Sequence, residues 1–332
     1  MIGWQARVFA VPEWFDQSVL LSNVALGATV VPVSTVGKDY DIGGYAILWQ
    51  NEFNCEIVDI DTITTTQLNL VRPTNSAWNA NTTRVVPARL GRINNNINVK
   101  LITKTLQIPT VNWELNPAQQ SANRLVSESL PTYRSYPIQL RKTNALEDQQ
   151  TFTHKVAVAD SRTGVKYYDA QSKAHRREQP YSIVTRNRTD LGQVLNFLYS
   201  LKGQFGAFWL PTWEFDMQLD QASIASNAST FNIKNIGYAR YRYATQSQID
   251  IMILLNNGTK YYRRITGATE AVDGSYETIN IDSSLGVLVN ATDINRISFL
   301  KLVRLESDKF SMTWQNLLGV AVFDVNLKDT NE

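Results

Sequence analysis

The sequence predicts a mainly β protein with one packed helix and small β modules on either side of it. Apolar residues alternate with polar ones in Ile97–Leu101, Phe310–Trp314 and Phe323–Leu327, and this period of two is typical of half-buried strands. Thr, Val, Ile and Tyr are abundant, as is usual in strands. The Asn-Asn-Gly of residues 256–258 and the Asp-Gly of 273–274 provide turns between them.

A single strong helix is predicted over residues 190–202. Thr189 or Asp190 would cap its N-terminus, and Gly203 would end it in a left-handed conformation. Five apolar side chains at helical spacing would form its buried face. They are Leu191, Val194, Leu195, Leu198 and Leu201. A second, weaker helix is expected from Pro117 to Leu125, with the proline in the first turn.

Two stretches far apart in the chain have a similar design. Gly44–Leu70 reads as strand, tight turn, strand, connection and strand, and Ile249–Ile281 reads the same way. The identities are few, and any two hairpin-rich segments share this pattern, so the sequence leaves open whether the two modules are a true repeat. Because 332 residues exceed what one core usually organises, we expect three domains, at residues 1–108, 109–220 and 221–332. Gln221–Asn235, rich in Ser, Ala and Asn, would be a connection.

Charge and hydropathy exclude several partners. The net charge of +2 does not indicate a basic surface that binds nucleic acid. The short basic cluster Lys173–Arg177 is expected to be a solvated loop. The N-terminus lacks the pattern of a signal peptide. Ser18–Val36 carries no charge, but its Asn, Ser, Thr and Pro make it a poor membrane span. We expect strand and turn there, covered by a neighbouring subunit.

The residue inventory offers little for catalysis, cofactors or metals. The one cysteine, Cys55, cannot form a disulfide within the chain and is expected to be a small buried residue. The two histidines, His154 and His175, match no metal motif, and His154 is expected to be packed on a strand. No phosphate loop, dinucleotide fingerprint or nucleophile elbow occurs. The sequence thus predicts a protein that is not an enzyme and has no cofactor or metal site.

Three pairs of carboxylates lie close together in the sequence and are candidates for a glycosidase or a calcium site. Glu214 and Asp216, beside Trp209 and Trp213, would face one side of a strand and could suit a glycosidase; an ordinary polar strand end is the simpler interpretation. The pairs Asp59 with Asp61 and Asp39 with Asp41 lack the twelve-residue loop of a calcium site. The apolar alternation slips near Asp59, which predicts a β-bulge.

The segment from Thr163 to Met217 resembles the C-terminal part of phage minor tail proteins of the tail-tip and distal-tail-like families. The shared features are a Thr-Gly strand, a helix like Leu191–Leu201 with Phe197 near its end, and the aromatic run in Lys202–Trp213. Gln204 stands where a basic residue is usual. Val85–Gly91 and Val303–Asp308 also look like strands of such proteins.

The resemblance implies a β-sandwich or tail-tube-like core with one packed helix. Such subunits form rings of three or six around a channel, beside tail-tube, hub or fibre proteins, so the chain is expected in the virion after assembly in the host cytoplasm. The resemblance carries no catalytic residue. Candidate interface residues are Phe205, Phe208, Trp209 and Trp213. The alternative is a tail-borne receptor- or carbohydrate-binding module, because Trp and Tyr on small β domains stack on sugars.

Overall fold

A computed structural model describes residues 7–330 except 104–106, 116–123, 144–150, 154–155, 161, 163, 165, 171–175 and 247. About 50% of the chain is strand and 10% is helical, in two large antiparallel sheets with only short helices. The predicted mainly β fold is therefore confirmed. The expected helix at 117–125 lies largely outside the described residues; Arg124 and Leu125 are described and are not helical.

The chain divides into two compact units, each assembled from separate stretches of sequence. The first contains Met1–Glu128, Val184–Phe197 and Met312–Val322, and the second contains Ser129–Ile183, Leu198–Ser311 and Phe323–Glu332. This division differs from the expected consecutive domains 1–108, 109–220 and 221–332. A boundary at residue 108 would separate two strands that pair with each other, a non-local contact that composition does not reveal.

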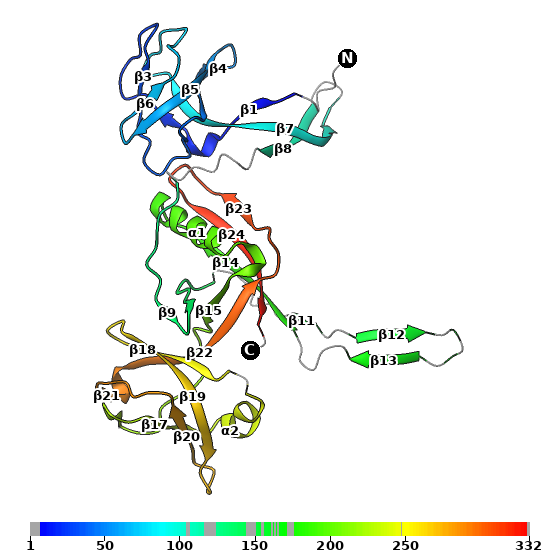
Figure 1. Ribbon diagram of the computed structural model, residues 1–332, viewed down its shortest axis with the longest axis vertical. Coiled ribbons are helices and arrows are strands. Elements are labelled where there is room, and N and C mark those ends of the chain that lie inside the picture. Colours follow the sequence, from blue (N-terminus) through cyan, green and yellow to red (C-terminus); the bar gives the residue numbers. More distant parts are fainter. Residues whose placement is uncertain are drawn as a thin grey trace. The chain divides into compact units, whose positions relative to one another are not determined.

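The first unit is built on one antiparallel sheet with the strand order β1-β7-β4-β5-β6-β3, and β2 and β8 also pair with β7 (Figure 1). Alternating residues of these strands form a core around the fully buried Tyr40 and Trp78. The strands are β1 (Phe9–Pro12), β2 (Ser18–Val19), β3 (Val30–Pro32), β4 (Tyr45–Asn51), β5 (Asn54–Thr64), β6 (Gln67–Leu70), β7 (Arg84–Leu101) and β8 (Gln107–Leu115).

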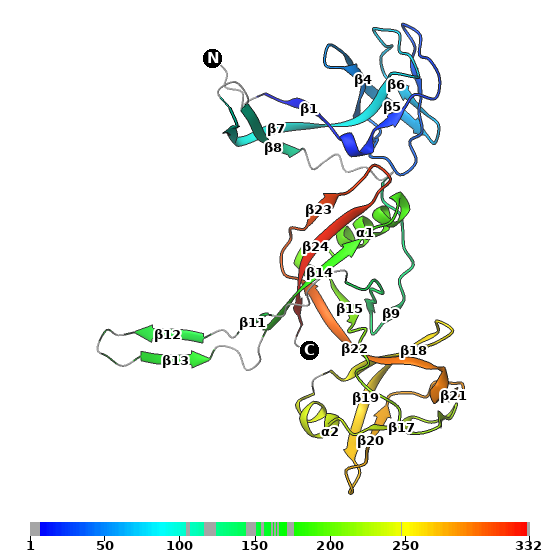
Figure 2. The same cartoon turned by 180° about the vertical axis from the view of Figure 1, so that it is seen from behind.

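The second unit contains a module with the strand order β22-β18-β19-β20-β17, drawn from yellow to orange beside the short helix α2 (Tyr238–Tyr241) in Figure 2. Phe231, Ile253 and Phe299 are among its buried core residues. The same sheet continues through β24, β14 and β11, and β15 pairs with β22. These strands are β11 (Thr151–Thr153), β14 (Arg176–Val184), β15 (Ala207–Pro211), β17 (Thr230–Lys234), β18 (Asp250–Leu255), β19 (Lys260–Glu270), β20 (Tyr276–Ile281), β22 (Ile294–Leu305) and β24 (Ala321–Asp329).

The two modules have the same topology, which decides a question that their sequence patterns left open. Each module contains five strands of the sheet. Counted along the chain, the fifth of these strands lies beside the second and the first lies beside the fourth, which gives the sheet orders β7-β4-β5-β6-β3 and β22-β18-β19-β20-β17. Smaller contacts agree as well. Leu20 bridges Val33 as Leu219 bridges Ile233. Such agreement in strand order and in minor bridges indicates an internal repeat.

The repeat is longer than the sequence pattern suggested, because it includes the strand that enters each module. The backbone N–H of Glu13 donates to Pro87 O at 2.8 Å after β1, and that of Thr212 donates to Phe299 O at 2.9 Å after β15. The sequences entering the modules also match. Pro-Glu-Trp-Phe-Asp at 12–16 corresponds to Pro-Thr-Trp-Glu-Phe-Asp at 211–216, with one inserted residue. This shared motif was the sequence signal for the full repeat.

The strong helix is present as α1 (Arg188–Ser200), and the five apolar residues of its predicted face are all buried. Its cap differs from the prediction. Asn187, rather than Thr189 or Asp190, caps the N-terminus: its Oδ1 accepts a hydrogen bond from the Asp190 N–H at 2.9 Å. The helix stops where Lys202 and Gly203 both adopt positive φ, 52° and 67°.

The expected β-bulge is confirmed as a register shift between Ile60 and Thr62. The tight turns are also confirmed, with positive φ at Gly258 and Gly274. Ser18–Val36 forms short strands and turns that bury Leu20 and Val31 but expose other apolar side chains. Coverage of this segment by a neighbouring subunit stays a prediction.

Gly192 lies where helix α1 contacts the backbone of the Arg124–Val126 segment. An added Cβ would lie 2.9 Å from Val126 Cγ2 and closer still to the Arg124 carbonyl oxygen. Replacing glycine by alanine in a helix usually stabilises by about 1 kcal/mol. Here we expect Gly192→Ala to lower the free energy of unfolding by roughly 1–2 kcal/mol, because overpacking outweighs helix propensity. Urea unfolding followed by circular dichroism measures this, with the exposed Thr189→Ala as the control; a stabilised Gly192→Ala variant would contradict it.

Candidate functional site

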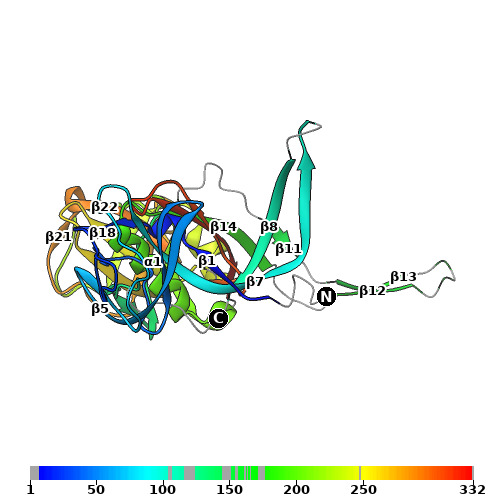
Figure 3. The same ribbon diagram turned by 90° about the horizontal axis from the view of Figure 1, so that it is seen from above.

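The most conspicuous surface of the first unit is the hairpin of β7 and β8, here called the arm (residues 91–115), which extends past the other strands of its sheet (Figures 1 and 3). Cross-strand partners share one face of a hairpin. Ile93 pairs with Trp113, and the next apolar pairs are Ile97 with Val111 and Val99 with Pro109. Polar pairs such as Arg92 with Glu114 occupy the alternating positions. The arm is therefore amphipathic.

The apolar face of the arm is open to solvent. Val99 is 55% exposed and Leu101 62% exposed, and Trp113 and Leu115 are exposed as well. The expectation that Ile97–Leu101 is half buried was therefore wrong, although the strand itself is present. The period of two was correct. Phe9 of β1 packs edge-on against Trp113, with 5.4 Å between the ring centroids, whereas Val99 and Leu101 farther along the arm are left mostly exposed. An isolated two-stranded hairpin is only marginally stable in water, so an apolar arm of this kind calls for a partner surface.

A second hairpin, β12 (Val156–Asp160) with β13 (Lys166–Ala170), also exposes large side chains, in the second unit. Tyr167 and Tyr168 are both well exposed. Since they are consecutive in a strand, their rings point to opposite faces. They do not form the adjacent pair of rings that stacks on one sugar.

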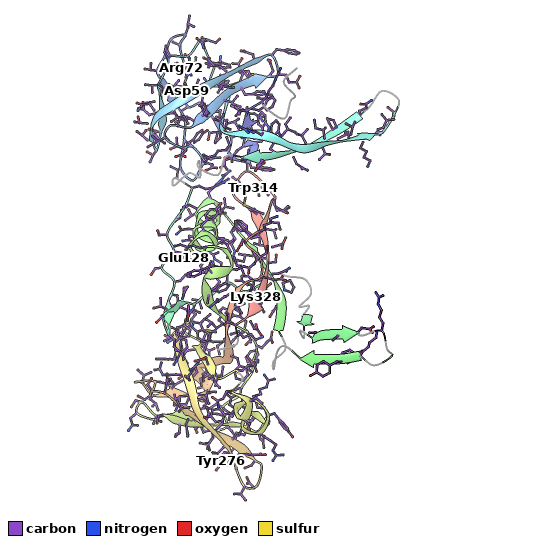
Figure 4. All side chains as sticks on the ribbon, turned by 45° about the vertical axis from the view of Figure 1, so that its right-hand side comes forward. Asp59, Arg72, Glu128, Tyr276, Trp314 and Lys328 are labelled. Atoms are coloured by element: carbon purple, nitrogen blue, oxygen red, sulfur yellow. The ribbon has the colours of Figure 1, made fainter. Side chains whose placement is uncertain are left out.

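The turn and first half of β5 form a third surface, here called the β5 surface, made of Glu52, Phe53, Cys55, Ile57 and Asp61. All five side chains are exposed, and Phe53 in the turn is 96% exposed. The prediction that Cys55 is buried was wrong, because the alternating residues of β5 that face the core start with Val58. Nearby, Asp59 pairs with Arg72, and the two are labelled side by side in Figure 4.

Inside the first unit lies a buried ionic cluster of three carboxylic acids and three arginines. Asp16, fully buried, pairs with Arg188 and accepts a hydrogen bond from Arg124 Nη2 at 2.9 Å. Asp39 Oδ1 lies 2.7 Å from Arg89 Nη2. The members are Glu13, Asp16, Asp39, Arg89, Arg124 and Arg188. The cluster joins the loop after β1, the Gly37–Asp41 turn, β7 and the start of α1.

Glu13 and Asp39 of this cluster share a hydrogen bond that shifts their pKa values in opposite directions. Burial, together with a hydrogen bond to Asp39 and its negative charge, raises the pKa of Glu13 to about 8. Burial alone would raise the pKa of Asp39 as well, but the hydrogen bond with Glu13 and the charge of Arg124 lower it below its usual value. Two further charges adjoin the cluster: Asp41 lies 3.6 Å from Arg89, and the Lys38 ammonium acts on Asp16 and Arg188.

The carboxylate oxygens of Glu13, Asp16 and Asp39 lie within 4.8 Å of one another, a spacing that a metal ion could use. The guanidinium groups of Arg89, Arg124 and Arg188 already contact these carboxylates. A cation would have to enter beside those three positive charges. The arrangement therefore fits an ion-pair network rather than a metal centre, and its role is to hold the first unit together.

The four predicted interface residues do not form one surface. Phe208 is 1% exposed and Trp209 is 5% exposed, because both are core residues and Trp209 packs in a cluster with Ile138; their assignment to an interface was wrong. Trp209 Nε1 donates to Tyr133 O at 2.9 Å inside the core. Phe205 is 81% exposed and stays a candidate. Trp213 is partly buried, with φ at 60°, an uncommon value for a bulky residue.

The candidate glycosidase pair has a structural use. Glu214 and Asp216 lie in the loop after β15, not on a strand, so the expected common face was wrong. Asp216 accepts hydrogen bonds from the Phe299 N–H at 2.9 Å and from the Thr212 hydroxyl, which anchors the loop to β22. His154, His175 and Lys173 lie outside the described residues.

The raised pKa of Glu13 makes stability depend on pH. The folded chain keeps this proton up to about pH 8, whereas the unfolded chain loses it near 4.5. Between these values the folded state binds more protons, so the free energy of unfolding falls as pH rises, by up to ~1.4 kcal/mol per pH unit. Thermal unfolding from pH 5 to 8 should show this slope, and Glu13→Gln should flatten it. Glu52→Gln, at an exposed glutamate, is the control; an equal slope in Glu13→Gln contradicts the assignment.

Comparisons with known proteins add no family. A scan against protein-family models finds no match, and a search of curated proteins finds none. Among the described residues no helix is both long and apolar enough to cross a membrane.

Proposed function

We propose that this chain is a structural subunit of a phage tail tip or baseplate ring, which connects the tail tube to tip or fibre proteins without catalysis. The arm carries the proposal. Its apolar face, with Val99, Leu101 and Trp113 exposed, is the kind of surface that assembly buries. An enzyme or a monomeric binding protein has no evident use for a projecting amphipathic hairpin.

The distribution of polar groups supports a structural role. The buried acids and arginines of the first unit are paired with one another. In the second unit, buried Asp250 accepts hydrogen bonds from the Tyr133 hydroxyl at 2.8 Å and from Arg264 at 3.0 Å. Catalytic groups are usually left available in a cleft. These groups are consumed by ion pairs and hydrogen bonds that hold strands and loops in place.

The resemblance of Thr163–Met217 to minor tail proteins supplies the biological setting of the proposal. The residues that carry it include the aromatic strand β15, whose Ala207 and Trp209 lie in one core cluster with Leu300 and Leu302 of β22. In a subunit of this kind the packed helix and sheet would form the rigid body, and the projecting hairpins would contact neighbouring subunits.

A receptor- or carbohydrate-binding module is the second candidate. Exposed Tyr167 and Tyr168 on β13 favour it. Because the two rings point to opposite faces, a single sugar could stack on only one of them. This geometry supports weak binding at most, and a glycan array with the purified chain tests it directly.

The ring proposal predicts discrete closed oligomers of the purified chain, alone or with tail-tube or hub proteins. Light scattering after size-exclusion chromatography gives the mass, and negative-stain electron microscopy should show rings. In phage particles, gold-labelled antibodies against the chain should mark the tail tip, with an antibody against a capsid protein as the control. A chain that stays monomeric with every tail protein tested, or a label confined to the capsid, would contradict the proposal.

A further inference from the structure

We propose that the arm of one copy docks, head to tail, on the β5 surface of a second copy of this chain. The contact deepens the proposed ring function by naming the two surfaces that would build it. It rests on the apolar faces of both surfaces, on an open strand edge, on charge complementarity and on the comparison of the two repeated modules.

The repeat shows that the arm is an addition to its module. The last strand of the second module, β22, ends at Leu305. Since Ala88 beside Pro12 corresponds to Leu300 beside Pro211, Leu305 corresponds to Ile93. β7 continues from there to Leu101 and returns as β8. The second module has its core and its five strands without such an extension, so the arm serves something other than the folding of the module.

The β5 surface offers an apolar complement and an open edge. Phe53, Cys55 and Ile57 are exposed where β5 begins. Over Asn54–Val58 this strand pairs with β4 on one side, while its pairing with β6 starts at Ile60. In the described part of the chain no strand pairs with the other edge of Asn54–Val58. Open edges accept an added strand, and the arm could supply one.

Charge favours contact between these two surfaces. Of the described charged residues of the arm, Arg92 and Lys100 are basic, and Glu114, the cross-strand partner of Arg92, is acidic. The β5 surface carries two exposed acids and no base, Glu52 and Asp61, while the neighbouring Asp59 is already paired with Arg72. The whole chain carries only +2, so the opposite charges are segregated onto the two surfaces. Complementary charge steers association and selects the partner.

The contact must join different copies. The arm grows out of β7, which is separated from β5 in the sheet by β4 alone, and it extends past these strands rather than back over them (Figures 1 and 3). An arm on a different surface of the next copy is a heterologous contact, which generates a ring when it closes. Each strand of the arm is about ten residues long, which corresponds to about 34 Å, and the two-stranded hairpin is roughly 10 Å wide. That footprint is smaller than the ~800 Å² per partner of a standard interface, so assembly should depend on concentration.

The test uses the natural Cys55 and one new cysteine on the arm. In Val99→Cys, a short bismaleimide should link position 99 of one copy to Cys55 of the next and produce a ladder of trimers and larger species. Thr110→Cys, on the opposite face of the arm, is the matched control and should give at least fivefold less of the trimers and larger cross-linked species. The wild-type chain should stop at dimers, and Cys55→Ser with Val99→Cys should lose the ladder. Equal ladders from Val99→Cys and Thr110→Cys would overturn the proposal.

Charge reversal provides a second, independent readout. Lys100→Glu should raise the concentration for half-assembly about tenfold, and Glu52→Lys in the same chain should restore it, because each copy contributes both surfaces. Replacing residues 94–112 by Asn-Gly should abolish assembly while thermal unfolding of the chain stays unchanged. Wild-type assembly of this shortened chain would reject the arm contact.

The outcomes separate this inference from the proposed function. If the shortened chain still assembles and antibodies against it still mark the tail tip, the arm contact is contradicted and the proposed function is not. If assembly depends on the arm but antibodies against the chain never mark a phage tail, the proposed function is contradicted and the arm contact is not.

Discussion

The buried ionic cluster is the constraint on which the first unit depends. Asp16 is fully buried, and it is paired with Arg188, the first residue of α1. A cation at a helix N-terminus is unfavourable to the helix dipole, so this position of Arg188 depends on Asp16. Removing one member of a buried ion pair leaves an uncompensated charge that costs about 3–5 kcal/mol.

The internal repeat shows how one framework was used in two ways. Asp16 and Asp216 occupy corresponding positions after the Pro-x-Trp motif. In the second module Asp216 accepts the Phe299 N–H and fixes a loop locally. In the first, Asp16 binds arginines that lie more than a hundred residues away in sequence. The local hydrogen bond and the distant ion pairs perform the same task, which is to fasten the entering strand to its module.

The surfaces of the first unit separate by charge and by hydropathy. The arm combines an apolar face with basic residues, and the β5 surface combines apolar residues with acids. Both lie outside the shared core of the repeat, where sequence is free to diverge without loss of folding. A mainly β protein also has strand edges to protect, and contacts between copies protect them by pairing or cover.

The sequence by itself determined what local periodicity encodes: the strands, the buried face of α1 and the bulge near Ile60. Periodicity says which residues share a face but not whether that face is covered, so Val99 and Cys55 were expected to be buried and Phe208 was expected at an interface. Coverage depends on residues distant in sequence, such as Tyr133, which packs against Trp209. Only the tertiary structure decided which faces are covered and which arginines pair with Asp16. Contacts between residues far apart in sequence produce no periodic pattern from which they could be predicted.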